Sequence, residues 1–252
     1  MRIGVVGLKM GLQLATWCRR LGMDVAVACD SDPARHGAVT LAEADYLHGM
    51  SPGDIDALIG DPAHWRGRIP PTAYCTHTIS PVLALTGAWP VEVSAFLVDE
   101  TDRRTAAVLV VRLSSGALAV TRHGFLQGEP GSHWSWVSAR GTRALAEAVR
   151  GPAERSWSVR LKAESWTRPD GAAHEEERTP PTLSFDGETV ERGAEGTVLV
   201  LQGFRATVER GEPPLIPVRP AVAASLVGVA GAESLSEGSR PVPVPAIGNG
   251  TP

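Results

Sequence analysis

Residues 2–30 read RIGVVGLKMGLQLATWCRRLGMDVAVACD, and this stretch decides how the chain begins to fold. Two short apolar runs, Arg2–Val6 and Val25–Cys29, have the length and composition of buried strands. Between them, the apolar residues of Gly11–Leu21 recur at helical spacing, which predicts an amphipathic helix. A strand, a glycine-rich turn, a helix and a second strand that ends in Asp30 are typical of the start of a dinucleotide-binding Rossmann unit.

The pattern changes sooner than a complete dinucleotide domain allows. In Leu41–His48 the polarity alternates with a period of two, which predicts a strand with Tyr46 and His48 on one face. A complete domain would supply about 80 further residues of alternating strand and helix before this point. We therefore predict a truncated Rossmann-like remnant over residues 1–40 and a second domain over residues 41–252.

The rest of the sequence is typical of an α+β protein. Polar, proline-flanked Glu164–Pro181 predicts a loop, and Ser51–Pro71 is rich in proline, glycine and aspartate. We predict a truncated Rossmann βαβ remnant followed by an open, mostly antiparallel β-sheet flanked by helices. The predicted strands are Val91–Val98, Ala106–Leu113, Ala117–Phe125, His133–Ser138 and Trp157–Ala163, and the predicted helices are His77–Thr86, Glu195–Arg210 and Ala221–Ser236, with an extended tail over Pro241–Ile247.

Composition excludes several classes of function. The chain has 252 residues, a formal net charge of −4 and no run of basic residues, so nothing supports a nucleic-acid surface. No stretch approaches about 18 consecutive apolar residues, so no membrane span is expected. Three widely spaced cysteines, Cys18, Cys29 and Cys75, fit reduced thiols in the cytoplasm. Because no CxxC or HExxH motif is present, we expect no metal site.

Several stretches, in the order in which they occur, resemble one known family. They are GVVGLKMG at 4–11, VAVACDSDPAR at 25–35, LAEADYLH at 41–48, PPTAYCTHTISPVLALTG at 70–87, AVLVVRLSSGALAVTRHGF at 107–125, WSWVSARGTRALAE at 134–147 and GVAGAESLSEGSRPVPVP at 228–245. Each stretch is weakly specific, but their order resembles that of the Gfo/Idh/MocA family, the relatives of glucose-fructose oxidoreductase and inositol dehydrogenase.

The resemblance implies a Rossmann domain followed by an open sheet that forms one wall of the substrate site. In this family the sheet usually forms the dimer interface, which implies a homodimer through the C-terminal domain. The family's substrates are mostly sugars, cyclitols and related polyols that are oxidised or reduced at a ring carbon. The resemblance therefore implies a small-molecule substrate.

The sequence departs from the family pattern in three places. The missing middle of the Rossmann domain would contain a Glu-Lys-Pro segment whose lysine contacts nicotinamide and substrate, and neither Lys9 nor Lys162 replaces it by position. Lys9 stands where the glycine turn has its second glycine, so its side chain would crowd the pyrophosphate. Ala73 stands one helical turn before His77, where many relatives carry an acid.

The resemblance marks His77 as a candidate catalytic residue, because an imidazole takes or gives a proton near neutral pH. Tyr46 and His48 share a strand face and are candidates to line the same pocket. The alternative interpretation of all three is structural, as side chains that are buried and satisfied by the fold. The candidate cofactor-binding residues, vestigial in this interpretation, are Gly7, Lys9, Gly11 and Asp30.

Other polar and aromatic residues are weaker candidates. Arg122 and His123 are neighbours on a predicted strand, so they point to opposite faces and only one faces a given cavity. Trp134 and Trp136 are predicted to share a face, either stacked on a sugar ring or packed in the core or a dimer interface. His174, followed by three glutamates, is predicted in a solvated loop.

Three functions remain open from the sequence. The one that we favour is a cofactor-independent, redox-neutral enzyme that performs elimination, isomerisation or cyclisation by acid/base chemistry on a small sugar-like or natural-product substrate. The second is an NAD(P)-dependent oxidoreductase of a sugar or polyol, with a cofactor site completed by a partner chain. The third is a non-catalytic binding or assembly partner.

Overall fold

Two short parallel strands begin the structure. The computed structural model describes the backbone of residues 2–5 and 24–28, and all of residues 37–102, 105–126, 128, 133–150, 157–179 and 181–247. β1 (Arg2–Val5) and β2 (Asp24–Ala28) pair in parallel, which confirms the two strands that the sequence predicts. The helix predicted over Gly11–Leu21 lies outside the described residues.

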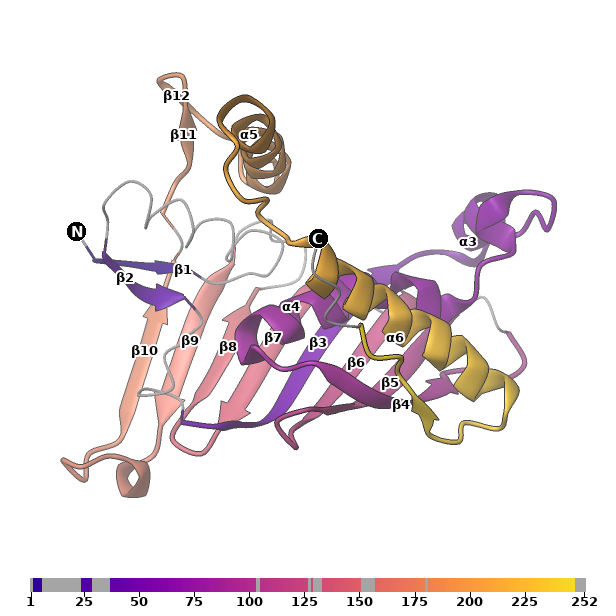
Figure 1. Cartoon of the computed structure of the whole chain (residues 1–252), viewed down its shortest axis with the longest axis horizontal. Helices are drawn as coiled ribbons and strands as arrows, with labels where there is room; N and C mark the ends of the chain where they lie inside the picture. The colour runs from indigo at the N-terminus through magenta and orange to yellow at the C-terminus, as the bar shows by residue number, and fades with distance from the viewer. Residues whose placement is uncertain are drawn as a thin grey trace.

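A nine-stranded sheet dominates the described chain (Figure 1). β3 and β6 run parallel, and every other neighbouring pair among these nine strands is antiparallel. The predicted α+β class with an open, mostly antiparallel sheet is therefore confirmed, and β3 lies in the middle of that sheet. In spatial order the strands are β10 (His174–Arg178), β9 (Ser158–Ala163), β8 (Leu145–Val149), β7 (Trp134–Gly141), β3 (Val39–Gly49), β6 (Leu118–Leu126), β5 (Ala106–Leu113), β4 (Pro90–Leu97) and β13 (Val242–Pro243).

Two helices, α4 (Thr76–Thr86) and α6 (Val218–Ser236), pack on one face of the sheet (Figure 1). We call this the helix face and the opposite side the outer face. Along β5, Leu109 and Val111 point to the helix face and are fully buried, whereas Val108 and Val110 point to the outer face and are half-buried. The main hydrophobic core therefore lies between the sheet and the two helices.

A short 3₁₀ helix, η2 (Pro71–Cys75), leads directly into α4 and packs closely on α6. The Thr72 hydroxyl donates a hydrogen bond of 2.8 Å to the carbonyl oxygen of Gly228. A Cβ atom at Gly228 would lie 2.9 Å from the carbonyl oxygen of Thr72, so the close approach depends on the glycine. This contact fixes the start of α4, where His77 is the second residue.

The loop predicted over Glu164–Pro181, with His174 in it, is wrong in its second half. Residues His174–Arg178 form β10, an edge strand paired with β9. Its sequence, HEEER, has no apolar alternation, and cross-strand ion pairs accompany the backbone pairing. One of these joins Lys162 Nζ to a Glu175 carboxylate oxygen at 3.2 Å. The strand is therefore held without a hydrophobic face, which is why its composition resembles that of a loop.

Two further helices lie outside the core layer. α3 (Pro52–Ile59) falls in the segment Ser51–Pro71, to which no element is assigned from the sequence. It is capped by Ser51, whose hydroxyl oxygen accepts from the Asp54 backbone N–H. α5 (Glu195–Arg210) has the predicted bounds and follows a two-residue hairpin pair, β11 (Ser184–Phe185) and β12 (Glu188–Thr189). Within the described ranges, no helix combines the length and the apolar character that crossing a membrane needs.

Candidate functional site

β3 presents Tyr46 and His48 on the helix face of the sheet. Because side chains alternate along a strand, Ala42, Ala44, Tyr46 and His48 share this face. The two alanines are buried in the core, and the two ring-bearing residues are half-buried. The ring centroids of Tyr46 and His48 lie 4.6 Å apart with planes at 88°, which is an edge-to-face contact.

α4 places His77 next to Tyr46 and His48. The imidazole of His77 stacks on the phenol ring of Tyr46, with centroids 4.0 Å apart and planes at 17°. The structure therefore places together the three residues that are candidates for catalysis from the sequence. Ala73 lies exposed on η2, so no carboxylate comes from the position one helical turn before His77.

Three further aromatic residues surround this group. Tyr74 stacks on Tyr46 at 6.5 Å, Phe125 lies 5.6 Å from His48, and Trp134 lies 5.4 Å from His48, all measured between ring centroids. We call the six residues the aromatic cluster: Tyr46, His48, Tyr74, His77, Phe125 and Trp134. Sequence reasoning missed Tyr74 and Phe125.

Burial keeps two histidines neutral at this site. Burial lowers the pKa of His48 below its ordinary value of 6.5. His123 is fully buried, and burial, followed by repulsion from His77, lowers its pKa to about 3. Within the described residues, neither ring nitrogen of His123 nor the hydroxyl of Thr121 has a hydrogen-bond partner. Both imidazoles are therefore uncharged at neutral pH.

An ion pair on the outer face joins β3 to β6, on the opposite side of the sheet from Tyr46. Arg122 donates two hydrogen bonds of 2.7 Å to the fully buried carboxylate of Asp45, and His133 Nδ1 lies 3.2 Å from the same carboxylate. Burial raises the pKa of Asp45, and the hydrogen bond from Arg122 opposes that rise. As predicted, Arg122 and His123 point to opposite faces.

The prediction that Trp134 and Trp136 share a face is wrong. The register between β3 and β7 shifts so that Trp136 lies opposite Asp45 while Trp134 lies opposite Tyr46. Between them Ser135 has a φ of 64°, and this bulge turns the two indoles to opposite faces. Trp134 therefore joins the aromatic cluster, and Trp136 packs near His133 on the outer face at 5.2 Å.

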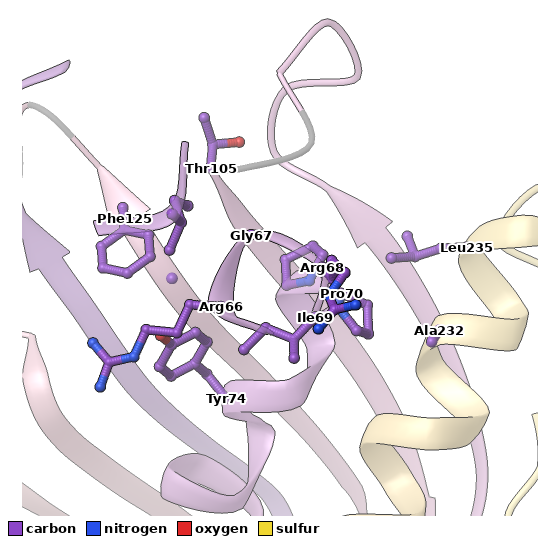
Figure 2. A pocket seen from close by; sticks show the side chains of 13 residues that line it. Arg66, Gly67, Arg68, Ile69, Pro70, Tyr74, Thr105, Phe125, Ala232 and Leu235 are labelled. Atoms are coloured by element: carbon purple, nitrogen blue, oxygen red, sulfur yellow. The ribbon is translucent and has the colours of Figure 1, made fainter. Parts of the chain in front are cut away.

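A cavity of about 370 Å³ opens beside the aromatic cluster (Figure 2). Tyr74 and Phe125 belong to both, so the cavity and the cluster share a wall. The volume is within the range of small-molecule sites. The other lining residues are Ile59, Arg66, Gly67, Arg68, Ile69, Pro70, Pro71, Thr105, Gly124, Ala232 and Leu235.

The predicted cofactor-binding residues are not part of the described site. Gly7, Lys9, Gly11 and Asp30 lie outside the described residues, so the structure gives no geometry for them. β1 and β2, the strands that would flank them, are described by their backbone pairing alone.

Several solved structures that share this fold are oxidoreductases. An aldose-aldose oxidoreductase from Caulobacter crescentus, solved with glycerol, has a TM-score of 0.60 and 16% identity, and the match covers 96% of this chain and 64% of that one. A levoglucosan dehydrogenase, solved with NADH and levoglucosan, has a TM-score of 0.63 and 13% identity over 94% of this chain and 64% of its own. An oxidoreductase from Agrobacterium radiobacter, solved with NAD⁺, L-tartaric acid and magnesium, has a TM-score of 0.57 and 14% identity over 95% and 64%.

These matches define the fold. The chain has the fold of Gfo/Idh/MocA-type oxidoreductases, with its nine-stranded sheet matching their C-terminal part, as the sequence resemblance implies. The chain spans just under two thirds of the length of these solved structures. No protein-family model and no curated protein matches the sequence.

Proposed function

We propose that the chain is a redox-neutral enzyme that performs acid/base chemistry at His77 on a small sugar-like or natural-product substrate, without a nicotinamide cofactor. The observation that carries this proposal is the stacking of His77 on Tyr46 at 4.0 Å, with His48 against the same phenol ring at 4.6 Å. Three groups that donate or accept protons meet here, beside a cavity of the size of a small molecule.

Each of the three groups has a role in this proposal. His77 takes the proton from the carbon next to a substrate carbonyl, while the Tyr46 phenol donates a hydrogen bond to the carbonyl oxygen. A double bond then forms between this carbon and the next one along the chain, the bond from that next carbon to its hydroxyl oxygen breaks, and His77 delivers the proton to the departing oxygen, so that water leaves. His48, kept neutral by burial, donates a hydrogen bond to a substrate hydroxyl. Isomerisation results instead when His77 returns the proton to the former carbonyl carbon, while the neighbouring hydroxyl proton moves to the former carbonyl oxygen and the neighbouring carbon becomes the new carbonyl carbon.

The short connection between β2 and β3 supports a reaction without a nicotinamide cofactor. β2 ends at Ala28 and β3 begins at Val39, so only residues 29–38 connect the two. A crossover with its helix needs at least 10 to 12 residues, before any further strand is counted. The connection cannot add the later βα units that build the nicotinamide side of a dinucleotide site. The residues present do not fit a complete NAD(P) site built by one chain.

A second candidate function is an NAD(P)-dependent oxidoreductase of a sugar or polyol, whose cofactor site is completed by a partner chain. The observation in its favour is that solved structures of the same fold hold NADH or NAD⁺. Within this chain the same His77 would then face a cofactor bound by another subunit. The two candidates differ in whether turnover needs added NAD(P).

We also propose that the chain forms a homodimer through the outer face of the sheet. Val108 and Val110 on β5 and Val120 on β6 lie half-buried on this face, and Phe96 on β4 is 44% exposed. A second copy would cover these apolar side chains.

Solvent-exchange mass spectrometry tests the proposed chemistry. The full chain is incubated in D₂O, without NAD(P), with glucose, glucuronate or glucose 6-phosphate. The expected result is deuterium at the carbon next to the carbonyl for at least one probe, lost in His77→Asn and kept in His174→Asn on β10. Exchange that persists in His77→Asn, no exchange with any probe, or product formed only when NAD(P) is added would contradict the proposal.

A further inference from the structure

The cavity contains two arginine side chains. Arg66 and Arg68 both line the cavity, and in the described ranges neither guanidinium forms an ion pair with a carboxylate. Among the described residues that line the cavity, none is acidic. Arginines that do pair with a carboxylate are Arg122, Arg140, Arg160, Arg168, Arg178, Arg192, Arg205, Arg210 and Arg240.

The segment that carries the two arginines has a defined shape. Trp65–Gly67 forms the 3₁₀ helix η1, and the Arg66 backbone N–H donates to Nδ1 of His64 at 3.3 Å. The guanidinium of Arg66 lies over the Trp65 ring, 5.1 Å from its centroid, which restricts the side chain. A Cβ atom at Gly67 would collide with the backbone of Asp61, so the turn is tight. The cationic groups are therefore held on an ordered turn.

The cavity shares two aromatic side chains with the aromatic cluster. Tyr74 lines the cavity and stacks on Tyr46, and Phe125 lines the cavity and contacts His48. Figure 2 shows the Arg66 side chain extending past Tyr74, while Arg68 lies beside Pro70. A ligand in the cavity would thus contact the arginine side chains and, at Tyr74 and Phe125, the wall that the cavity shares with the aromatic cluster.

We propose that this cavity binds the anionic group of the substrate, a carboxylate or a phosphate, through Arg66 with Arg68 as the second cation. Guanidinium groups bind both anions by charge-assisted hydrogen bonds, and no carboxylate among the described lining residues competes for them. The substrate class is therefore a sugar acid or a sugar phosphate rather than a neutral polyol. That this ligand is the substrate rests on the proposed function, whereas the anion site itself does not.

Calorimetric titration of the full chain with four probes tests the inference: glucose, glucuronate, glucose 6-phosphate and inorganic phosphate. The expected result is that glucuronate or glucose 6-phosphate binds at least about tenfold more tightly than glucose, and the tighter of the two identifies the anion. Arg66→Met is expected to weaken that binding by about tenfold or more, and Arg68→Met by less. The matched control is Arg205→Met on α5, which removes the same charge from an exposed ion pair.

Three results would overturn the inference: equal affinity for glucose and both charged sugars, unchanged affinity in Arg66→Met, or an equal loss in Arg205→Met. The same titration in His77→Asn separates this inference from the proposed function. Anion binding that survives in His77→Asn, together with no deuterium exchange in the wild type, would leave the anion site established and the proposed chemistry wrong.

Discussion

The buried imidazole of His123 makes the stability of the fold depend on pH. Its pKa is lowered to about 3, because burial disfavours the charged ring and the nearby His77 adds repulsion. In the unfolded chain the same group titrates near 6.5. As the pH falls below about 6.5, the unfolded state takes up a proton that the folded state does not bind until about pH 3. Stability is therefore lost across this window.

The size of the effect follows from the two pKa values. Each unit of difference corresponds to about 1.4 kcal/mol, so His123 lowers the free energy of unfolding by about 2 kcal/mol between pH 7 and pH 5. His123→Phe removes the titrating group at a position where, among the described residues, the ring nitrogens make no hydrogen bond. Between pH 7 and pH 5, the free energy of unfolding of the variant is expected to fall by about 2 kcal/mol less than that of the wild type.

Urea unfolding followed by circular dichroism, at pH 7 and at pH 5, measures this difference. Thr121→Val is the matched control, because it removes a buried hydroxyl without a described partner from the same strand face but no titrating group. Its pH dependence is expected to equal that of the wild type. An equal loss of stability in the wild type and in His123→Phe would refute the burial of a neutral imidazole at this position.

Three other substitutions test the packing and the assembly. Arg122→Met leaves the buried carboxylate of Asp45 without its main partner and is expected to lower the free energy of unfolding in urea by about 2 to 3 kcal/mol. Adding Asp45→Asn is expected to recover part of this loss. An unchanged free energy of unfolding in Arg122→Met would contradict the ion pair. Gly228→Ala places a methyl group 2.9 Å from the Thr72 carbonyl oxygen. It is expected to lower the free energy of unfolding by about 1 to 3 kcal/mol and to reduce activity at His77. An unchanged melting curve would argue against the close contact. Val110→Glu on the outer face is expected to convert a dimer into a monomer in sedimentation velocity, whereas a wild type that is monomeric at all concentrations would refute the proposed dimer.

The sequence predicts the regular, apolar parts of the fold and misses the polar parts. The bounds of α5 follow from apolar residues at helical spacing, and β3 follows from strict alternation. The edge strand β10 could not be found in this way, because its pairing is supported by ion pairs rather than by a buried face. The start of α3 could have been predicted, because a serine N-cap followed by a proline is typical of the first residues of a helix, as at Ser51 and Pro52.

The candidate site was predictable where its residues share one element. Tyr46 and His48 lie two residues apart on a strand, so their common face follows from geometry alone. The family resemblance supplied His77, whose contact with Tyr46 depends on how α4 packs on the sheet. Phe125 and Trp134 reach the site from other strands, and the bulge at Ser135 cannot be recognised from the local sequence pattern.

Titration of NADH and NADPH tests most directly whether this chain works without a nicotinamide cofactor, as we propose. The full chain is used at a concentration at which any dimer has formed, and nicotinamide fluorescence and heat are followed together. We expect no saturation, with a dissociation constant weaker than about 1 mM. Binding of one nucleotide per chain with a dissociation constant in the micromolar range, about −8 kcal/mol, would contradict it.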